Sequence, residues 1–391
     1  MPDRSITDDR DWQDVRAAWP LSDGVTCLNH GSFGCVPRPV SEARQQWLDR
    51  ASALPMDFYL RQAEDALLAA RDRLADFVGA GRGDLVWVEN ASYAMNVVAA
   101  NCPLAAGDEV LLTDHAYGAV RRIWQRACQR AGAELKEVSL PLPVTSDEQL
   151  VAAVTASLTQ RTRLLVISHI TSPSAIILPV AKICRVARGR GVRVCIDGPH
   201  ALANLPLDLT ALDCDYYVCS CHKWLCAPPG TGFLYVHPRH QGTFEPLVIS
   251  WGRLLPELPQ SWQEEFTWIG TRDLSGLLSV PAAIDFLAEI GWEAFRQRTH
   301  FLAQEARRRI TQLTSLEPLV PDSPRWYGPM ITLPVPPGDP YELRDALWQR
   351  YQIELPAPTI GDRRCVRVSC HLYTQTSDLD RLVTALSELL Y

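Results

Sequence analysis

The stretch YYVCSCHKWLCAPPGTGFLYV, residues 216–236, places a lysine and a Pro-Pro-Gly turn between two apolar runs. Lys223 follows the first run closely, so its ammonium lies near a strand end and close to the interior, where desolvating a charge is costly. A lysine in a surface turn would fit this stretch equally well. The rest of the chain must therefore show whether Lys223 is only a turn residue or takes part in chemistry.

The composition indicates a globular protein that handles small molecules. The 391 residues are 47% hydrophobic, which allows one large core and a smaller one. The net charge is -7, and no run of like charges suggests a nucleic-acid or membrane surface. The start of the chain, MPDRSITDDRDWQDV, lacks an apolar signal segment, which predicts a cytoplasmic location.

The twelve cysteines include no CxxC pair, and we expect most of them to be small buried residues in a reducing compartment. Cys219, Cys221 and His222 are the cluster most similar to a metal site. Neighbouring strand positions point to opposite faces of a sheet, which argues against zinc there. We therefore predict no metal.

Short apolar runs alternate with helix-compatible runs, which is the pattern of a parallel sheet covered on both faces. The expected strands are 85–88, 109–113, 163–168, 192–196, 216–220 and 232–236, with helices at 91–101, 119–131 and 180–189. Further along we expect a helical stretch at 274–315, a strand near 330–335 and helices at 340–351 and 377–390. This pattern predicts an N-terminal segment 1–27, a large domain 28–265 and a smaller α+β domain 266–391.

Polar residues follow several of these strands, at the sheet edge where ligands bind in open α/β folds. Asp197 and His200 follow the strand at 192–196, and Lys223 follows the next strand. An aspartate in such a place often caps a turn, so a purely structural role is the alternative for Asp197. Together the three residues place a carboxylate, an imidazole and an amine at one edge.

Two more groups reach the same edge. Ala91 and Ser92 open the helix behind the strand at 85–88, and a helix start offers free N–H groups and a positive dipole end that suit a phosphate. Ser92 could also serve only as a helix-start residue. His115 follows the strand at 109–113, where a lone histidine is more often structural than a ligand.

Pyridoxal phosphate requires all of these groups at once. It needs a lysine for a Schiff base, an aspartate to keep the pyridine nitrogen protonated, a phosphate cradle and a flat group over the ring. Burial favours the neutral amine of Lys223, which can form the imine and afterwards move the α-proton of an amino acid. These requirements favour a reactive role for Lys223 over a place in a surface turn.

Several motifs span most of the chain: LNHGSFGCVPRPV from residue 28, ENASYAMNVV, GDEVLLTDHAYGAV, VCIDGPHALANLPLDL, CSCHKWLCAPPGTGFLYV, WIGTRD, and VRVSCHLYT near residue 373. With them the chain resembles the class V aminotransferase family of fold type I pyridoxal phosphate enzymes. Within that family it is most similar to the isopenicillin N epimerase-like branch, which is related to cysteine desulfurases. The resemblance implies an α/β fold with a mainly parallel seven-stranded sheet sandwiched by helices and a smaller α+β C-terminal domain.

The resemblance also implies roles around the cofactor. Lys223 would carry pyridoxal 5'-phosphate, Asp197 would pair with the pyridine nitrogen, and His115 would stack on the ring. His200 would lie by the 3-oxygen of the ring. The residues implied near the phosphate are Ala91, Ser92, Ser220 and His222.

Substrate and partner contacts are implied in the same way. Arg367 resembles the arginine that grips the α-carboxylate, a task suited to a bidentate guanidinium, whereas an exposed strand arginine is the alternative. Asn29 and His30 would line the substrate entrance. Thr271 is similar to the threonine that family dimers lend to the phosphate of the partner subunit, so a homodimer is implied.

The implied activity is chemistry at the α-carbon of an amino acid, through an external aldimine and α-deprotonation. Family desulfurases carry a nucleophilic cysteine in the segment that reads RYQIELPAPTIGD here, which contains none, and Cys365 on the same expected strand as Arg367 is a packed residue. This argues against a persulfide-forming desulfurase and favours an epimerase-like enzyme or a C–S lyase. Epimerisation needs a second acid/base opposite Lys223, for which Tyr59 and Tyr117 are the candidates if they are not simply packed aromatics. A true aminotransferase and a non-catalytic pyridoxal phosphate-binding protein remain the alternatives.

Overall fold

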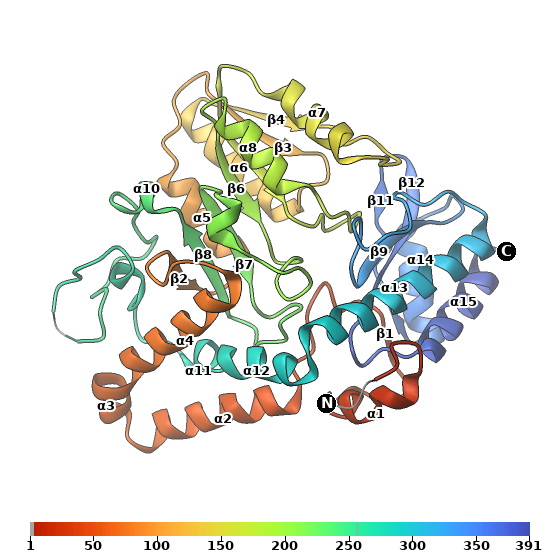
Figure 1. Cartoon of the computed structure of the whole chain (residues 1–391), viewed down its shortest axis with the longest axis horizontal. Coiled ribbons are helices and arrows are strands. Elements are labelled where there is room, and N and C mark those ends of the chain that lie inside the picture. The colour runs from red at the N-terminus through yellow and green to blue at the C-terminus, as the bar shows by residue number, and fades with distance from the viewer. Residues whose placement is uncertain (1–3, 256) are drawn as a thin grey trace.

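The computed structural model describes residues 4–255 and 257–391 and contains a central seven-stranded sheet (Figure 1). The strand order is β2-β8-β7-β6-β5-β3-β4, and β8 is the antiparallel member of a mainly parallel set. The strands are β2 (Leu85–Val88), β3 (Glu109–Thr113), β4 (Glu134–Val138), β5 (Thr162–Ser168), β6 (Arg193–Asp197), β7 (Tyr216–Ser220) and β8 (Gly232–Val236). This arrangement confirms the predicted α/β fold class.

Six of these strands coincide with the expected ones to within a residue or so, and β4 was missed. Strand β4 has the sequence ELKEV and lies at the edge of the sheet, paired with β3 alone. Only Val138 of its five residues is buried. An edge strand with this polar composition lacks the apolar run by which the central strands were identified.

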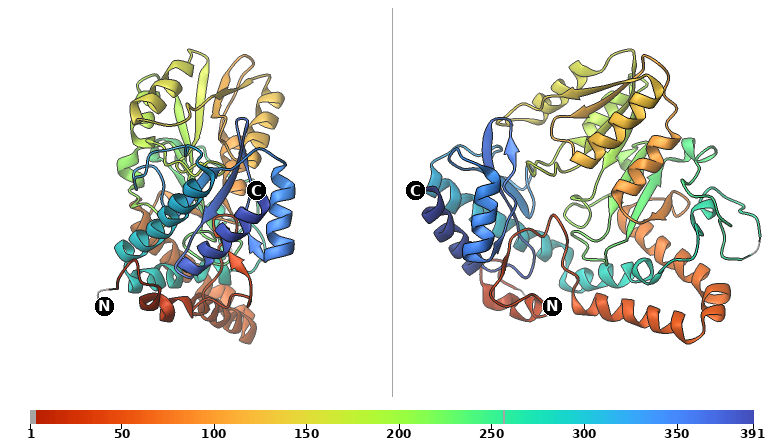
Figure 2. Two further views of the ribbon diagram at one scale, coloured as in Figure 1. Left: turned by 90° about the vertical axis from the view of Figure 1, so that its right-hand side faces the viewer. Right: turned by 180° about the vertical axis from the view of Figure 1, so that it is seen from behind.

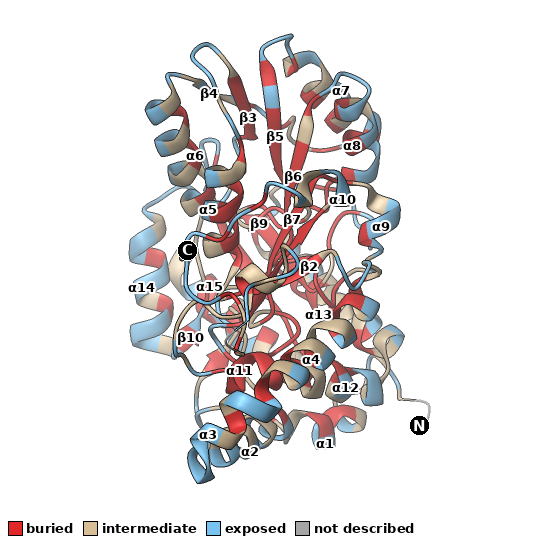
Figure 3. Ribbon diagram, turned by 90° about the vertical axis from the view of Figure 1, so that its left-hand side faces the viewer, coloured by how far each residue is buried: buried red, intermediate tan, exposed pale blue. Residues whose placement is uncertain are grey.

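Helices cover both faces of the sheet (Figure 3). On one face α5 (Ala91–Asn101) and α6 (Gly118–Ala131) pack on alternate strand residues such as Val86 and Val88. The other face, which includes Leu85 and Trp87, packs against α4 (Ala63–Val78), α7 (Asp147–Ser157) and α8 (Val180–Arg188). Because successive side chains of a strand point to opposite faces, short continuous apolar strands build both cores at once.

The stretch expected to be helical at 274–315 forms three helices rather than one. They are α11 (Ser275–Leu278), α12 (Val280–Ile290) and α13 (Trp292–Thr314). Gly291 has φ 98°, a backbone conformation outside the helix that separates α12 from α13, and Pro281 lies in the first turn of α12. The helices α11 and α12 pack against α2 (Arg38–Ala53) and α4.

The C-terminal part has its own three-stranded antiparallel sheet in the order β11-β12-β9, seen in blue at one end of the molecule (Figure 2). Its strands are β9 (Met330–Pro334), β11 (Thr359–Ile360) and β12 (Arg363–Ser369). The helices α13, α14 (Pro340–Tyr351) and α15 (Thr376–Leu390) pack around it. The N-terminal strand β1 (Thr26–Cys27) pairs in parallel with β10 (Ile353–Glu354), so the start of the chain lies with its end.

Short elements complete the fold. They are η1 (Asp9–Trp12), α1 (Gln13–Arg16), α3 (Pro55–Asp57), the π-helical η2 (Phe58–Gln62), α9 (Leu209–Leu212), α10 (Pro238–Gln241) and η3 (Glu264–Phe266). A long and mostly irregular segment joins α10 to α11 (Figure 1). Among the described residues no helix combines the length and apolarity needed to span a bilayer.

Residues 28–34 cross from the small sheet to the backbone of Lys223, and Gly34 is the closest approach. The Gly34 N–H donates to the His222 carbonyl at 3.1 Å. A Cβ at Gly34 would lie 2.2 Å from the Lys223 carbonyl oxygen and 2.4 Å from that of His222. A side chain at this position therefore cannot be accommodated without moving the backbone that carries the lysine.

We expect Gly34→Ala to lower the free energy of unfolding by about 1–3 kcal/mol, because the added methyl group overlaps backbone atoms that cannot rotate away. Urea unfolding followed by circular dichroism measures the loss. Gly118→Ala is the matched control, since a Cβ there has no atom within 4 Å. Equal unfolding midpoints for the two variants would contradict the close approach.

Candidate active site

A cavity of about 550 Å³ lies where β6 and β7 end and α5 begins. It brings together nine of the residues predicted from the sequence: Ala91, Ser92, Tyr117, Asp197, His200, Ser220, His222, Lys223 and Arg367. The other lining residues are Gly31, Ser32, Phe33, Asn90, Val120, Ser172, Pro199 and Pro356. Segments separated by hundreds of residues thus supply one concave site that holds several ionisable side chains.

The cavity makes the amine of Lys223 easier to deprotonate than that of an exposed lysine. Burial lowers the pKa of Lys223 to about 8, although the charge of Asp197 opposes this shift. The positive charge of Arg367 lowers the pKa further. The ammonium is still the main form at pH 7, but the unprotonated and nucleophilic amine is far more abundant there than in an exposed lysine, and it becomes the main form above pH about 8.

Asp197 is the last residue of β6, and its carboxyl group is buried. Burial raises the pKa of Asp197 to about 6, and the charge of Lys223 limits the rise. The carboxylate is consequently the main form at neutral pH, at a place where it can face a protonated ring nitrogen. The sheet sets this geometry, because β6 and β7 are parallel neighbours that end at the same edge.

His200 connects Lys223 to the protein interior. The indole N–H of Trp224 donates to Nδ1 of His200 at 3.1 Å, and Nε2 of His200 lies 3.2 Å from Nζ of Lys223. Burial holds the pKa of His200 well below its usual range, so the ring is neutral. With Nδ1 accepting, the proton of the neutral ring lies on Nε2, which can donate to the electron pair of Lys223 when that amine is unprotonated.

The start of α5 has the properties of a phosphate cradle. The Ala91 N–H donates to Oγ of Ser220 at 2.9 Å, which joins the helix start to the end of β7, and Ser92 lines the cavity beside them. Nδ1 of His222 is buried and has no hydrogen-bond partner among the described residues. A phosphate would satisfy this atom and would lie at the positive end of the helix dipole. The residues present therefore fit this part of the cofactor.

Arg367, on β12, is positioned by a set of acceptors from two loops. It donates to the Ser172 carbonyl at 2.8 Å, to Oγ of Ser32 at 2.9 Å and to Oδ1 of Asn29 at 3.2 Å. Burial lowers the pKa of Arg367 to about 10, which leaves it charged at neutral pH. Its Nε is buried without a partner among the described residues. The guanidinium is thus fixed with donor capacity left for a carboxylate.

The loop after β5 was missed in the sequence, as was Ser32. Besides the contact of Ser172 with Arg367, Oγ of Ser174 lies 2.7 Å from Nδ1 of His115 and 2.6 Å from Oγ1 of Thr171. The signal was available, because the polar run TSPS closely follows a buried strand.

His115 lies beside the cavity but is not among its lining residues. It follows β3 and is buried, and burial lowers its pKa, which the charge of Asp114 opposes. The hydrogen bond to Ser174 fixes the ring orientation. Its stacking on the cofactor ring stays a prediction.

His30 and Asn29 do not line the entrance as expected. His30 is fully buried, with Nδ1 3.1 Å from the Tyr373 hydroxyl and Nε2 3.1 Å from the Lys223 carbonyl. Cys226 and His371 offer ligand atoms within 4.8 Å of it, yet both nitrogens of His30 already have partners. His30 therefore supports the lysine backbone, and Asn29 reaches the cavity only through its hydrogen bond with Arg367.

Tyr59 and Thr271 also lie outside the cavity lining. The Tyr59 hydroxyl donates to the Arg272 carbonyl at 3.3 Å, and its ring packs at right angles near Trp268. Tyr59 thus supports the segment that carries Thr271 and is not placed to meet a substrate. Thr271 itself is exposed.

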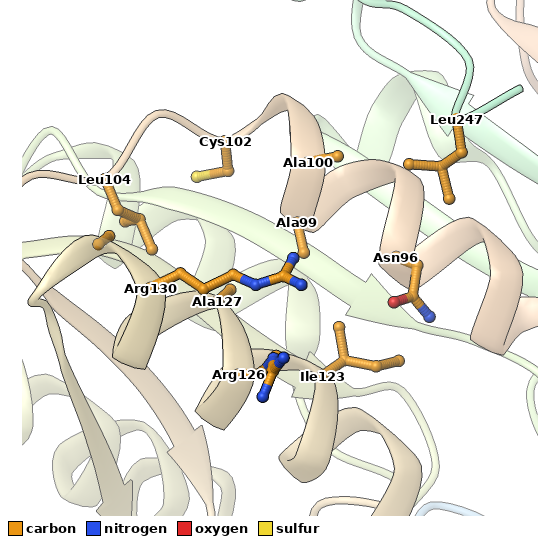
Figure 4. A pocket seen from close by; sticks show the side chains of 11 residues that line it. Asn96, Ala99, Ala100, Cys102, Leu104, Ile123, Arg126, Ala127, Arg130 and Leu247 are labelled. Atoms are coloured by element: carbon orange, nitrogen blue, oxygen red, sulfur yellow. The ribbon is translucent and has the colours of Figure 1, made fainter. Parts of the chain in front are cut away.

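A second hollow of about 430 Å³ lies between α5 and α6 (Figure 4). It is lined by small and apolar side chains and by Arg126 and Arg130 of α6, with Leu247 at its border. None of the predicted site residues borders it. The groups that can do chemistry on an amino acid lie in the first cavity.

Comparisons with known proteins agree with this geometry. The family model for aminotransferase class-V matches residues 35–382. Isopenicillin N epimerase of Amycolatopsis lactamdurans is 40% identical over 97% of this chain and 98% of its own, and L-cysteine desulfhydrase of Arabidopsis thaliana is 30% identical over 94% and 88%. A solved structure of a C-DES mutant with glycine covalently linked to its PLP cofactor superposes with a TM-score of 0.83, at 25% identity over 95% of this chain and 99% of that one.

The chain belongs to the class-V aminotransferase family. Its cofactor is pyridoxal 5'-phosphate, which acts when bound as an electron sink for a carbanion at the α-carbon of an amino acid. Lys223, Asp197 and the start of α5 with Ser220 and His222 are the residues that would hold it. Arg367 is placed to bind a carboxylate in the same cavity, and the amine of Lys223 is a group there that could accept a proton.

We expect the apoprotein to react with pyridoxal phosphate faster as the pH rises, with the rate levelling off above pH about 8. The neutral amine is the reactive form, and it becomes dominant above the lowered pKa rather than above the ordinary value of 10.5. Stopped-flow absorbance of the bound cofactor measures the rate. Lys223→Ala should give no such absorbance, and a midpoint near 10.5 would contradict the burial of this amine.

Proposed function

We propose that this enzyme is an amino-acid epimerase, which removes the α-proton of its substrate and returns it on the opposite face. The observation that carries the proposal is a pair of proton-carrying side chains in one cavity: Nζ of Lys223 lies 5.9 Å from the ring centre of Tyr117. The 40% identity to an isopenicillin N epimerase, over nearly all of both chains, supports the same reaction class. Epimerisation needs acid/base groups on both faces of the α-carbon.

Tyr117 takes the second acid/base role in this proposal. Its side chain is 48% exposed and lines the cavity, and its hydroxyl has no hydrogen-bond partner among the described residues. Tyr59, the other candidate from the sequence, lies outside the cavity lining and donates to Arg272. The hydroxyl of Tyr117 is therefore free to exchange a proton with substrate and solvent.

A C–S lyase is the second candidate. The relationship to L-cysteine desulfhydrase favours it, and β-elimination needs Lys223 but no second acid/base. Residues 350–362 contain no cysteine, and Cys365 is fully buried on β12, so a persulfide on a mobile cysteine is not part of either proposal. Lys223, Asp197 and Arg367 around one cavity argue against a cofactor-binding protein without turnover.

We expect the holoenzyme, incubated with a panel of L-amino acids in deuterated water, to yield α-deuterated product of inverted configuration. Tyr117→Phe should keep α-deuterium exchange with retention, while inversion falls by about 10²–10⁴-fold, because only Lys223 still carries protons. Chiral chromatography with mass spectrometry separates the two products. Release of pyruvate with sulfide or thiol from the sulfur-containing amino acids would instead identify the lyase, and equal loss of exchange and inversion would remove Tyr117 from the role.

We also propose a homodimer in which Thr271 reaches the cofactor phosphate of the partner subunit. The support is the exposure of Thr271 together with an apolar surface on the same segment between α10 and α11. This surface consists of Leu247, Val248, Ile249, Trp251 and Leu258, which are 43% to 82% exposed. Exposed large apolar residues gathered on one segment are typical of protein interfaces.

Ile249→Asp is expected to convert the dimer to a monomer that binds pyridoxal phosphate more weakly, because a charge is introduced into the interface and the threonine of the partner is lost. Sedimentation velocity and a cofactor titration measure the two effects. Tyr341→Asp, at an exposed aromatic on α14, is the control that should change neither. The proposal would be contradicted if the wild-type protein sediments as a monomer and still binds pyridoxal phosphate with full affinity.

A cytoplasmic location is a further part of the proposal. All twelve cysteines are unpaired in the structure, and ten of them are buried. Burial raises the pKa of thiols such as Cys102 and Cys365, which makes them unreactive. Free thiols in this number are typical of a reducing compartment.

A further inference from the structure

Two cysteines differ from the other ten. Cys27 and Cys35 are only partly buried, and they flank residues 28–34, the segment LNHGSFG. Cys27 ends β1, whereas Cys35 lies just before α2. Any bond between them would close this segment into a loop.

The two thiols meet at one hydroxyl group. Sγ of Cys27 lies 3.4 Å from Oη of Tyr373, and Sγ of Cys35 lies 3.7 Å from the same oxygen. The thiols also influence each other, because the side chain of Cys35 lowers the pKa of Cys27 to about 6 and that of Cys27 raises the pKa of Cys35. The pair is thus adjacent, partly accessible and asymmetric, with Cys27 as the sulfur that ionises first.

The enclosed segment supports both functional ends of the cavity. Asn29 and Ser32 accept hydrogen bonds from Arg367, while His30 and Gly34 contact the backbone of residues 222–223. The Tyr373 hydroxyl lies within hydrogen-bond distance of His30 and also contacts the two thiols. A change at the thiols therefore acts on residues that position the substrate-binding arginine and the lysine.

We propose that Cys27 and Cys35 form a redox-reactive dithiol site that a low-molecular-weight disulfide, such as oxidised glutathione, converts into a disulfide closing residues 28–34. The Cys27 thiolate attacks one sulfur of oxidised glutathione, which forms a mixed disulfide and releases one glutathione thiolate. Cys35 then loses its proton to solvent and attacks the sulfur of Cys27, which releases the second glutathione. The protein loses two electrons and two protons, and oxidised glutathione gains them as two thiols.

The test uses the holoenzyme treated with oxidised glutathione, blocked with iodoacetamide and digested with trypsin without reduction. Cys27 and Cys35 fall in one tryptic peptide, 17–44, because Pro39 blocks cleavage after Arg38. This peptide should be two hydrogen atoms lighter than its fully reduced form and carry no alkylation, and dithiothreitol should reverse the change. Amide hydrogen exchange of residues 28–34 should slow in the oxidised protein, because both ends of the segment become tied.

Two variants make the test specific. Cys35→Ser should stop at a glutathione adduct on Cys27, since the second attack is lost. Cys27→Ser should leave Cys35 free of glutathione, since the more acidic thiol is gone. The proposal is overturned if the wild-type peptide remains doubly alkylated after oxidation, if glutathione goes to the ten buried cysteines at the same rate, or if exchange of residues 28–34 is unchanged.

Discussion

The balance of charge and desolvation at the Lys223 amine is the constraint on which the rest of the site depends. Burial disfavours the ammonium, Asp197 favours it, and Arg367 disfavours it again. The resulting pKa of Lys223, about 8, lets the amine lose its proton readily but still allows it to carry a charge. An exposed lysine would be almost fully protonated at neutral pH. Without the carboxylate of Asp197, a buried lysine would have no negative charge beside it to attract the protonated ring of the cofactor.

This balance requires that three parts of the chain meet at one point. The large sheet supplies Asp197 and the lysine, and the small sheet supplies Arg367. Residues 28–34 fill the space between them, with Gly34 against the lysine backbone and Asn29 bridged to Ser369 of the small sheet. A shift of the small sheet would therefore move the arginine, its acceptors and the lysine together, so the parts are coupled through packed backbone rather than through a flexible connection.

The sequence was most informative where a local pattern decides the outcome. Six of the seven central strands and the polar groups Asp197 and Lys223 at their ends could be predicted, because a doubly buried strand is a continuous apolar run and its end is marked by the first polar residue. Arg367 with Ser172 and Ser32 could not be found in this way. Their contacts join residues 195 and 335 positions apart, and short-range periodicity carries no information on such pairs.

The same limit explains the outcome for the two tyrosines. Tyr59 and Tyr117 are equivalent in sequence terms, since each is an aromatic residue with a hydroxyl group near an expected motif. Tertiary packing separates them, because the π-helical turn at η2 aims Tyr59 at the Arg272 carbonyl, whereas Tyr117 precedes α6 at the carboxyl edge of the sheet. The fold thus decides which of the two hydroxyl groups reaches the cavity.

A second proton carrier must recover its proton from solvent between turnovers, and this requirement discriminates among the side chains near Lys223. His30 and His115 are buried, their pKa values are lowered by burial, and their hydrogen bonds to Tyr373 and Ser174 already fix their orientation. Protonating either ring would leave a charge without solvent, at a cost that its neighbours do not offset. Tyr117, half-exposed and lining the cavity, avoids this cost because water reaches its hydroxyl group. Solvent access, rather than intrinsic acidity, is therefore the property that suits this residue to the proposed role beside a buried lysine.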